Sequence, residues 1–143
     1  MMIIGFDLDG VICDYSPWIV NELKNESSKR MYYLDRKLLV NPSTFATDDD
    51  EIIIVADRPT IYKDVTADWL EEHGIEYPIY FIGNKHTELT PRHSAIKKAG
   101  IIKEHDIDIF FDDNREVVEH LREMTDAKIV YVRTHLDFEK WKY

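Results

Sequence analysis

Short apolar runs alternate with helix-like segments along the chain, and this alternation constrains the fold more than any other feature. Each run is too short for a typical helix and ends in polar or turn-forming residues, which favours buried β-strands. The expected strands are residues 2–6, 52–55, 79–82, 107–111 and 128–132. Between them, apolar residues recur at helical spacing, and the expected helices are residues 16–25, 61–73, 92–99 and 116–124.

Strands that alternate with helices predict βαβ units, and therefore a parallel sheet with helices on both faces. The expected fold class is α/β, a doubly wound, Rossmann-like sheet in a single domain of residues 1–143. Residues 27–51 fit the alternation least well, and we expect them to form a small insertion packed over one edge. The aromatic residues of the C-terminal tail are expected to dock on the surface or on a partner; they are Phe138, Trp141 and Tyr143.

Acidic residues follow two of the expected strands. Asp7 and Asp9 come at the end of the first strand, and Asp112 and Asp113 follow the fourth. In a doubly wound sheet, ligands bind beyond the carboxyl ends of the strands, where the strand order reverses. Carboxylates crowded at that edge repel one another, and a hard dication that prefers oxygen ligands relieves the repulsion. The sequence therefore predicts a Mg²⁺ site formed by these four residues.

The same carboxylates predict phosphoryl chemistry. A carboxylate oxygen beside a metal-held phosphate can attack phosphorus, and a second carboxyl group can protonate the leaving group and then activate water. These roles fit Asp7 as the nucleophile and Asp9 as the acid and base.

These motifs resemble those of the haloacid dehalogenase (HAD) superfamily of phosphohydrolases. Asp7-Leu8-Asp9-Gly10-Val11 matches the first motif, DxDx[TV], and Ile109-Phe110-Phe111-Asp112-Asp113 matches the fourth, an apolar strand that ends in paired acids. The resemblance implies a HAD-like fold with a minimal cap and an open pocket. It also implies an aspartyl-phosphate intermediate and Mg²⁺ bound by the side chains of Asp7 and Asp112 and the main-chain carbonyl of Asp9, with Asp113 as a water-mediated contact.

The second motif departs from the family pattern. Residues 54–59 look like those of the 5'-nucleotidase and deoxyribonucleotidase branch, in which the strand ends in a phosphate-binding Thr or Ser followed by small-Arg-Pro. Here that position is Ala56, which has no hydroxyl; Thr60 or a backbone N–H are alternative donors. Ala56, Asp57 and Arg58 are expected to line the substrate site, where Arg58 either reaches the phosphate or pairs with a nearby carboxylate.

The third motif of the family is a Lys or Arg that neutralises the carboxylates and the phosphate. Lys85, Arg92 and Lys97 are candidates, and Lys98 is expected to face elsewhere. Lys85 is favoured because it follows the expected strand 79–82 by a few residues, although a solvated loop lysine is an equally good interpretation. Arg92 is expected to contact the substrate.

Charge and composition limit the partners. Eighteen basic and 28 acidic residues give a formal net charge of −10, which disfavours sequence-independent binding to a long nucleic acid or an anionic membrane. One cysteine cannot form an internal disulfide, and neither a signal peptide nor an apolar run of ~20 residues is present. The expectation is a cytoplasmic protein that acts on a small phosphorylated substrate, and a homo-oligomer is compatible with an open pocket.

Two function classes remain. The first is a Mg²⁺-dependent phosphatase for a small phosphomonoester, with nucleotides among the candidate substrates. The second is a catalytically weakened HAD-like protein with a binding or regulatory role, which Ala56 and the unassigned lysine favour. A phospho-accepting receiver domain is disfavoured because its acidic pair follows the first strand, whereas the adjacent pair here comes late in the chain.

Overall fold

A five-stranded parallel sheet forms the centre of the molecule. The computed structural model describes residues 1–133, so the expectations for Phe138, Trp141 and Tyr143 lie outside the described residues. The strands are β1 (Ile3–Asp7), β2 (Glu51–Ala56), β3 (Ile79–Phe81), β4 (Ile109–Asp112) and β5 (Lys128–Tyr131). They lie in the order β3-β2-β1-β4-β5, and every neighbouring pair is parallel. The predicted α/β, doubly wound class is confirmed.

The strand order places β1 at the centre of the sheet. The chain adds β2 and β3 on one side of β1 and then returns to add β4 and β5 on the other side. The reversal therefore falls between β1 and β4, which is the usual position of a ligand site in such sheets. Because Phe6 of β1 is in register with Phe111 of β4, Asp7 and Asp112 follow at the same edge.

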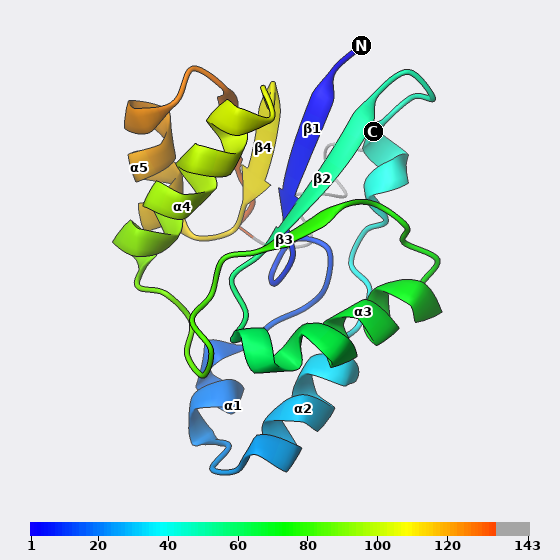
Figure 1. Cartoon of the computed structure of the whole chain (residues 1–143), viewed down its shortest axis with the longest axis vertical. Helices are drawn as coiled ribbons and strands as arrows, with labels where there is room; N and C mark the ends of the chain where they lie inside the picture. The colour runs from blue at the N-terminus through cyan, green and yellow to red at the C-terminus, as the bar shows by residue number, and fades with distance from the viewer. Residues whose placement is uncertain (134–143) are drawn as a thin grey trace.

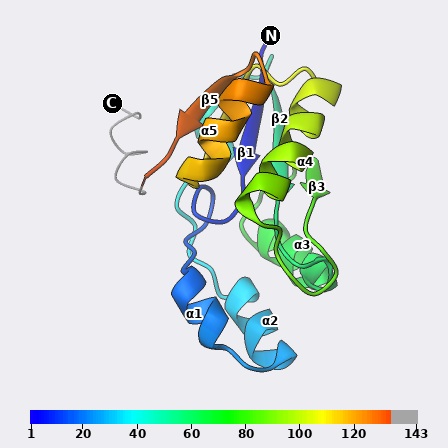
Figure 2. The same ribbon diagram turned by 90° about the vertical axis from the view of Figure 1, so that its left-hand side faces the viewer.

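Helices connect successive strands. The helices are α1 (Pro17–Glu22), α2 (Glu26–Leu34), α3 (Lys63–Glu72), α4 (Pro91–Glu104) and α5 (Arg115–Met124), with short 3-10 turns η1 (Pro42–Phe45) and η2 (Thr60–Tyr62). Figures 1 and 2 show α4 and α5 side by side against one face of the sheet, while α1 and α2 lie beyond the carboxyl ends of the strands.

Two apolar layers cover the faces of the sheet. Along β2, Ile54 and Ala56 point to one layer, in which Trp69 of α3 is fully buried. Val55 points to the other layer, which contains the buried faces of α4 and α5, including Leu121. Both faces of the central strands are therefore covered, which explains why those strands are apolar at nearly every position.

Two helix ends test the sequence expectations. Gly74 has a φ of +67° just after α3, as a glycine C-cap requires. Gly100 does not end α4, contrary to the prediction, because the helix continues to Glu104. Ile102 beyond it is buried in the α4–α5 layer, and this packing offsets the ~1 kcal/mol that glycine costs inside a helix.

The segment expected to be an insertion holds most of α2 and all of η1. Tyr32 and Tyr33 of α2 form a small apolar cluster with Tyr62 and with Val65 of α3. The α2 part of the segment therefore packs onto the start of α3. The η1 part packs on the sheet, where the Phe45 ring lies 6.2 Å from that of Phe6 in β1.

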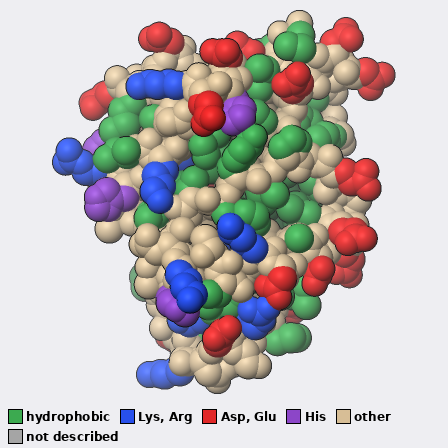
Figure 3. Space-filling model, in the orientation of Figure 1, with side chains coloured by type: hydrophobic (Ala, Val, Ile, Leu, Met, Phe, Trp, Pro, Cys, Tyr) green, Lys and Arg blue, Asp and Glu red, His purple; other side chains and the backbone are tan. Residues whose placement is uncertain are grey.

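The described residues form no large patch of one charge on the face of the molecule in Figure 3. On the face shown in Figure 3, basic side chains lie singly or in small groups, with acidic side chains between several of them and apolar side chains across the middle. Among residues 1–133, no helix combines the length and the apolar character that crossing a membrane requires.

Candidate active site

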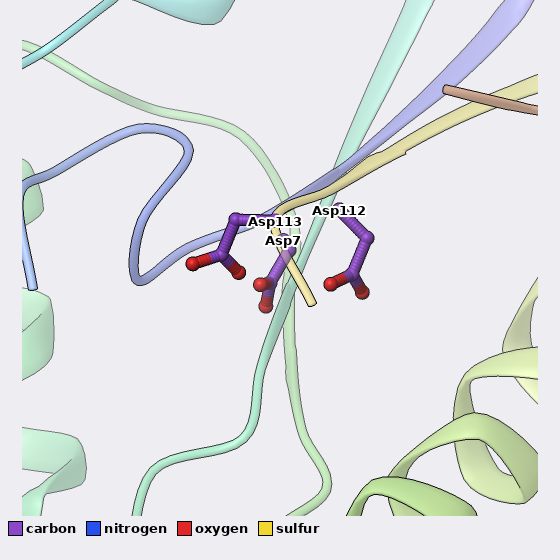
Figure 4. Close-up of side chains that lie close together, drawn as sticks. All are labelled: Asp7, Asp112 and Asp113. Atoms are coloured by element: carbon purple, nitrogen blue, oxygen red, sulfur yellow. The ribbon is translucent and has the colours of Figure 1, made fainter. Parts of the chain in front are cut away.

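Three carboxylates meet where β1 and β4 end. Asp7, Asp112 and Asp113 each offer an oxygen atom within 4.8 Å of the other two, and Figure 4 shows their side chains side by side. Asp112 is fully buried, and Asp7 nearly so. The structure therefore brings together three of the four residues that the sequence predicts as metal ligands.

A tight loop after β1 makes room for this cluster. The Leu8 carbonyl accepts a hydrogen bond from the Ile12 amide at 2.9 Å, and Gly10 turns the chain with a φ of +83°. A Cβ atom at position 10 would collide with the carboxylate of Asp113. Position 10 thus requires glycine for two reasons: its backbone has a positive φ, and the Asp113 side chain leaves no room for a Cβ atom.

A buried lysine lies against the carboxylates. Lys98 of α4 donates a hydrogen bond to Asp112 Oδ2 at 2.7 Å, and its Nζ lies 3.4 Å from Asp7 Oδ1. The expectation that Lys98 faces elsewhere is wrong. Because α4 buries positions 94, 95, 98, 99 and 102, residue 98 lies on the helix face that packs against the sheet.

The three basic residues favoured from the sequence lie away from the carboxylates. Lys85 is exposed in the loop after β3, and Arg92 is exposed in the first turn of α4. Lys97 donates a hydrogen bond to the Ile82 carbonyl at 3.3 Å. Lys98, and not one of these three, is seen to form ion pairs with Asp7 and Asp112 among the described residues.

Burial and mutual repulsion change the pKa values of the cluster. Burial raises the pKa of Asp7 well above its ordinary range, and the Asp112 and Asp113 charges add to this effect although Lys98 opposes it. Burial and the Asp112 charge raise the pKa of Asp113 to about 7. Burial alone would lower the pKa of Lys98, but Asp112 and Asp7 outweigh it and keep the ammonium charged.

Asp9 is held by a buried arginine. Arg58 Nε and Nη2 donate hydrogen bonds to the Asp9 carboxylate at 3.0 and 2.8 Å, and Arg58 Nη1 donates to Thr66 Oγ1 at 3.0 Å. The Arg58 side chain is fully buried and lies over the Tyr33 ring. Of the two roles that the sequence left open for Arg58, the structure shows the salt bridge.

We expect the Arg58→Met substitution to lower the free energy of unfolding by about 3–5 kcal/mol, because it leaves the Asp9 carboxylate without its buried partner. Chemical denaturation of both proteins at neutral pH measures the difference. Arg92→Met is the matched control, since Arg92 is exposed, and it should leave the unfolding curve unchanged. Equal stability of the Arg58 and Arg92 variants would contradict the structural role of Arg58.

A cavity of about 230 Å³ opens over the carboxylates. Six of its lining residues are acidic and one, Lys98, is basic; the lining residues are Asp7, Asp9, Tyr15, Pro17, Asp57, Glu88, Leu89, Pro91, Ser94, Lys98, Asp112, Asp113, Asn114 and Val117. Strongly acidic lining of this kind suits a site that receives a cation.

Of the second-motif residues, Asp57 faces the cavity and Ala56 faces the apolar layer. Asp57 lines the cavity and accepts a hydrogen bond from the Leu89 amide at 3.0 Å; burial raises its pKa. Ala56 is fully buried in the apolar layer beneath α3 and does not line the cavity. Thr60, the alternative hydroxyl, is also absent from the cavity lining.

Sequence reasoning missed several residues that line the cavity. Tyr15 and Glu88 meet there, since the Tyr15 hydroxyl donates a hydrogen bond to Glu88 Oε1 at 2.5 Å, yet they are far apart in the chain. Ser94 and Lys98 lie one helical turn apart, on the same face as the apolar Ala95, Ala99 and Ile102. The apolar periodicity of α4 was the signal that could have identified both of them.

Solved structures of other proteins share this fold. A structure of the Pnkp1/Rnl/Hen1 complex superimposes with a TM-score of 0.66 at 16% identity, over 92% of this chain and 45% of the other. A structure of the Pnkp1/Rnl/Hen1 RNA repair complex gives a TM-score of 0.59 at 16% identity, over 92% and 42%. The HAD domain of effector protein Lem4 from Legionella pneumophila gives a TM-score of 0.57 at 15% identity, over 98% and 92%.

These likenesses define the fold class. The chain spans less than half of the matched chains in the two complexes and most of the Lem4 HAD domain. No protein-family model matches the sequence, and no curated protein matches it either. The chain therefore has a HAD-like α/β fold, and an acidic cluster that could bind a metal lies where that fold brings its strand ends together.

Proposed function

We propose that this chain is a Mg²⁺-dependent phosphatase that acts on a small phosphomonoester through a phosphorylated Asp7. The observation that carries the proposal is that Asp7 lies beside the Lys98 ammonium and within reach of the Asp112 and Asp113 carboxylates, at the switch point of a HAD-like sheet. Structural likeness to the Lem4 HAD domain supports the fold on which the proposal depends.

The chemistry of the acidic cluster fits Mg²⁺. Asp7, Asp112 and Asp113 offer only carboxylate oxygens, the ligands that this ion prefers. Burial, together with repulsion among the three carboxylates, raises the pKa values of Asp7 and Asp113 although Lys98 opposes the change. When bound, Mg²⁺ would offset this charge and polarise a phosphoryl oxygen.

In the proposed mechanism, Asp7 and Lys98 act on the phosphoryl group. A carboxylate oxygen of Asp7 forms a bond to phosphorus while the bond from phosphorus to the leaving oxygen breaks. Lys98 Nζ lies 3.4 Å from Asp7 Oδ1, so its charge orients the nucleophile and stabilises negative charge that develops on the phosphoryl oxygens. The burial of both side chains excludes water and strengthens these interactions.

Asp9 completes the proposed cycle as the proton carrier. Its carboxyl group gives a proton to the leaving oxygen and later takes one from the water that attacks the phosphorylated Asp7. The two hydrogen bonds from Arg58 fix the position of the Asp9 carboxyl group at the edge of the cavity. Arg58 thus acts as a positioning residue for Asp9.

The charge of the cavity limits the proposed substrate. Six acids against one lysine disfavour a leaving group that carries further negative charge, because each added charge is repelled by Asp57 and Glu88 at short range. A nucleoside monophosphate or a sugar phosphate fits this description. The proposed relation to the nucleotidase-like branch is supported by Arg58 and Pro59 in the second motif.

A phosphomonoester panel tests the function. The purified full chain is assayed with p-nitrophenyl phosphate, nucleoside monophosphates, nucleoside diphosphates and sugar phosphates, with Mg²⁺ or with EDTA. We expect Mg²⁺-dependent release of phosphate, faster from monophosphates than from diphosphates. No turnover across the panel by Mg²⁺-loaded protein would favour the weakened binding protein instead, a function that the buried, hydroxyl-free Ala56 supports.

Metal binding should depend on pH. Asp113, with a folded-state pKa of about 7, holds a proton between about pH 4 and pH 7 that the unfolded chain releases, so it contributes stability at low pH that is lost as pH rises through this window. Mg²⁺ must displace that proton. We therefore expect Mg²⁺ to raise the unfolding temperature more at pH 8 than at pH 6, as measured by calorimetry.

Asp113→Asn provides the control for this pH dependence. In EDTA, the wild type should become less stable relative to the variant as pH rises from about 4 to about 7. The uncharged amide does not ionise, so the variant does not lose the stability that Asp113 loses. Mg²⁺ should raise the unfolding temperature of Asp113→Asn much less than it raises that of the wild type. A Mg²⁺ effect of equal size at pH 6 and pH 8 in the wild type would contradict the prediction.

A further inference from the structure

Resting on the proposed phosphatase function, we propose that Ser94 supplies the hydroxyl donor to the substrate phosphate that Ala56 cannot supply. Ala56 stands where the resemblance puts a phosphate-binding Thr or Ser, but it has no hydroxyl and points into the apolar layer beneath α3. Ser94 approaches the cavity from α4 on the other face of the sheet. The hydroxyl is thus delivered by a different element of the fold.

The Ser94 hydroxyl is buried beside the Asp57 carboxyl but makes no hydrogen bond of good geometry to any described residue. Ser94 is 2% exposed, and among residues 1–133 its Oγ is the buried side-chain oxygen or nitrogen that lacks a partner of good geometry. It lies close enough to the Asp57 carboxyl to oppose the rise in its pKa that burial causes. Buried polar atoms without a partner are rare and indicate strain, function or an absent ligand.

Local geometry leaves this hydroxyl available to a ligand. A serine inside a helix commonly donates its hydroxyl hydrogen to the carbonyl four residues earlier. Here that carbonyl, on Thr90, accepts the backbone amide of Ser94 at 2.8 Å, and Ser94 Oγ makes no such bond. The hydroxyl can rotate away from its Asp57 neighbour and donate to a phosphate in the cavity that Ser94 lines.

Ser94 and Lys98 form one surface of the cavity. They are four residues apart on α4, so their side chains lie one turn apart on the same face. Lys98 contacts Asp7 and Asp112, and the first turn of α4 borders the same cavity through Pro91. A phosphate beside Asp7 therefore meets a cation, a hydroxyl and the positive end of a helix of 14 residues, and these three groups oppose the repulsion by the acidic residues of the cavity.

A purely structural role for Ser94 predicts different behaviour. A small residue is useful where α4 packs closely on α5, and alanine would serve that purpose at least as well, because it is a better helix former and buries no polar atom. If packing alone mattered, Ser94→Ala would leave phosphate binding unchanged. If the hydroxyl holds phosphate, the same variant binds phosphate more weakly while its unfolding temperature stays equal or rises.

The test is the binding of inorganic phosphate to the full chain by isothermal titration calorimetry with Mg²⁺. We expect Ser94→Ala to weaken binding by about tenfold or more, the loss of one hydrogen bond to a charged group. Ser94→Thr, which keeps a hydroxyl, should recover most of the affinity. Ser43→Ala removes an exposed hydroxyl on η1, away from the cavity, and should bind as the wild type does. The KM for p-nitrophenyl phosphate should rise in parallel in Ser94→Ala.

The outcomes separate this inference from the proposed function. If the wild type binds and hydrolyses phosphate esters and Ser94→Ala binds phosphate equally well, the inference is wrong and the phosphatase function stands. An equal loss of affinity in Ser43→Ala, or a lower unfolding temperature in Ser94→Ala, also overturns the inference. If the wild type neither binds phosphate nor hydrolyses any ester, both the function and the inference fail.

Discussion

Replacing Asp7 with Asn should abolish phosphate release while making the metal-free protein more stable. The loss of rate should reach at least about 10⁴-fold, because removing a covalent nucleophile leaves only the residual catalysis of the binding groups. The measurement is p-nitrophenyl phosphate hydrolysis at saturating Mg²⁺, with the wild type and Asp7→Asn prepared in parallel.

The gain in stability follows from the position of Asp7 among other acids. Its pKa is raised by burial and by the Asp112 and Asp113 charges, so the folded protein loses stability as pH rises above the ordinary range of a carboxyl group toward the raised pKa of Asp7. Asn keeps the shape and removes the charge. Thermal unfolding in EDTA at pH 8 should therefore show a higher midpoint for Asp7→Asn. A variant that still hydrolyses the ester at a comparable rate would contradict the role of Asp7, and one that is less stable would contradict the crowding of the carboxylates.

The second large effect concerns Lys98. Lys98→Met keeps the length of the apolar stem but removes the ammonium that contacts Asp7 and Asp112. We expect the kcat to fall by about 10²–10³-fold, the usual effect of removing one donor that stabilises developing charge in a buried site. Steady-state kinetics on p-nitrophenyl phosphate measure this fall.

Lys85→Met is the matched control for Lys98→Met. Lys85 is exposed in the loop after β3, and it is the residue that the sequence alone favours for the same role. The structure predicts that Lys85→Met hydrolyses the ester as fast as the wild type. The reverse pattern, with a large loss for Lys85→Met and none for Lys98→Met, would show that the loop after β3 moves into the site and that the buried lysine is structural.

The sheet could be predicted from the sequence because its strands are buried on both faces. Ile52 to Val55, for example, form a continuous apolar run that a strand covered by helices on both sides requires. The acids at the ends of β1 and β4 were predictable for the same reason, since they interrupt apolar runs at the edge where parallel strands end. Asp7 and Asp112 needed only the strand order to bring them together.

The positions of Lys98 and Ser94 at the site were harder to predict from the sequence. Distance along the chain from β3 favoured Lys85, whereas Lys98 reaches the site because α4 begins at Pro91 and carries residue 98 back along the sheet. The direction of a helical side chain depends on where the helix begins and which face is buried. The expected helix ended before Gly100 and therefore left out Ile102, which is buried on the same side of α4 as Lys98 and Ala99. Without Ile102, the buried face of the helix was harder to recognise.

Arg58 was ambiguous for a different reason. Its place beside the second motif is compatible both with contact to a phosphate and with a salt bridge. The fold decides between these roles because Thr66 and Tyr33, from α3 and α2, enclose the guanidinium together with Asp9. Such long-range enclosure is not visible in local sequence patterns. The proposed consequence is that the segment with α1 and α2 supports the catalytic acid and base as well as bordering the cavity through Tyr15 and Pro17.

Detection of a phosphoryl group on Asp7 tests the central claim most directly. The Asp9→Asn variant, which lacks the base for the second step, is incubated with p-nitrophenyl phosphate and Mg²⁺, quenched in acid and digested for mass spectrometry. The account predicts that the peptide containing Asp7 gains the mass of one phosphoryl group. The gain should disappear with EDTA and in the Asp7→Asn, Asp9→Asn double variant. An adduct that persists in the double variant, or ester hydrolysis by the wild type that never yields an adduct on this peptide, would contradict it.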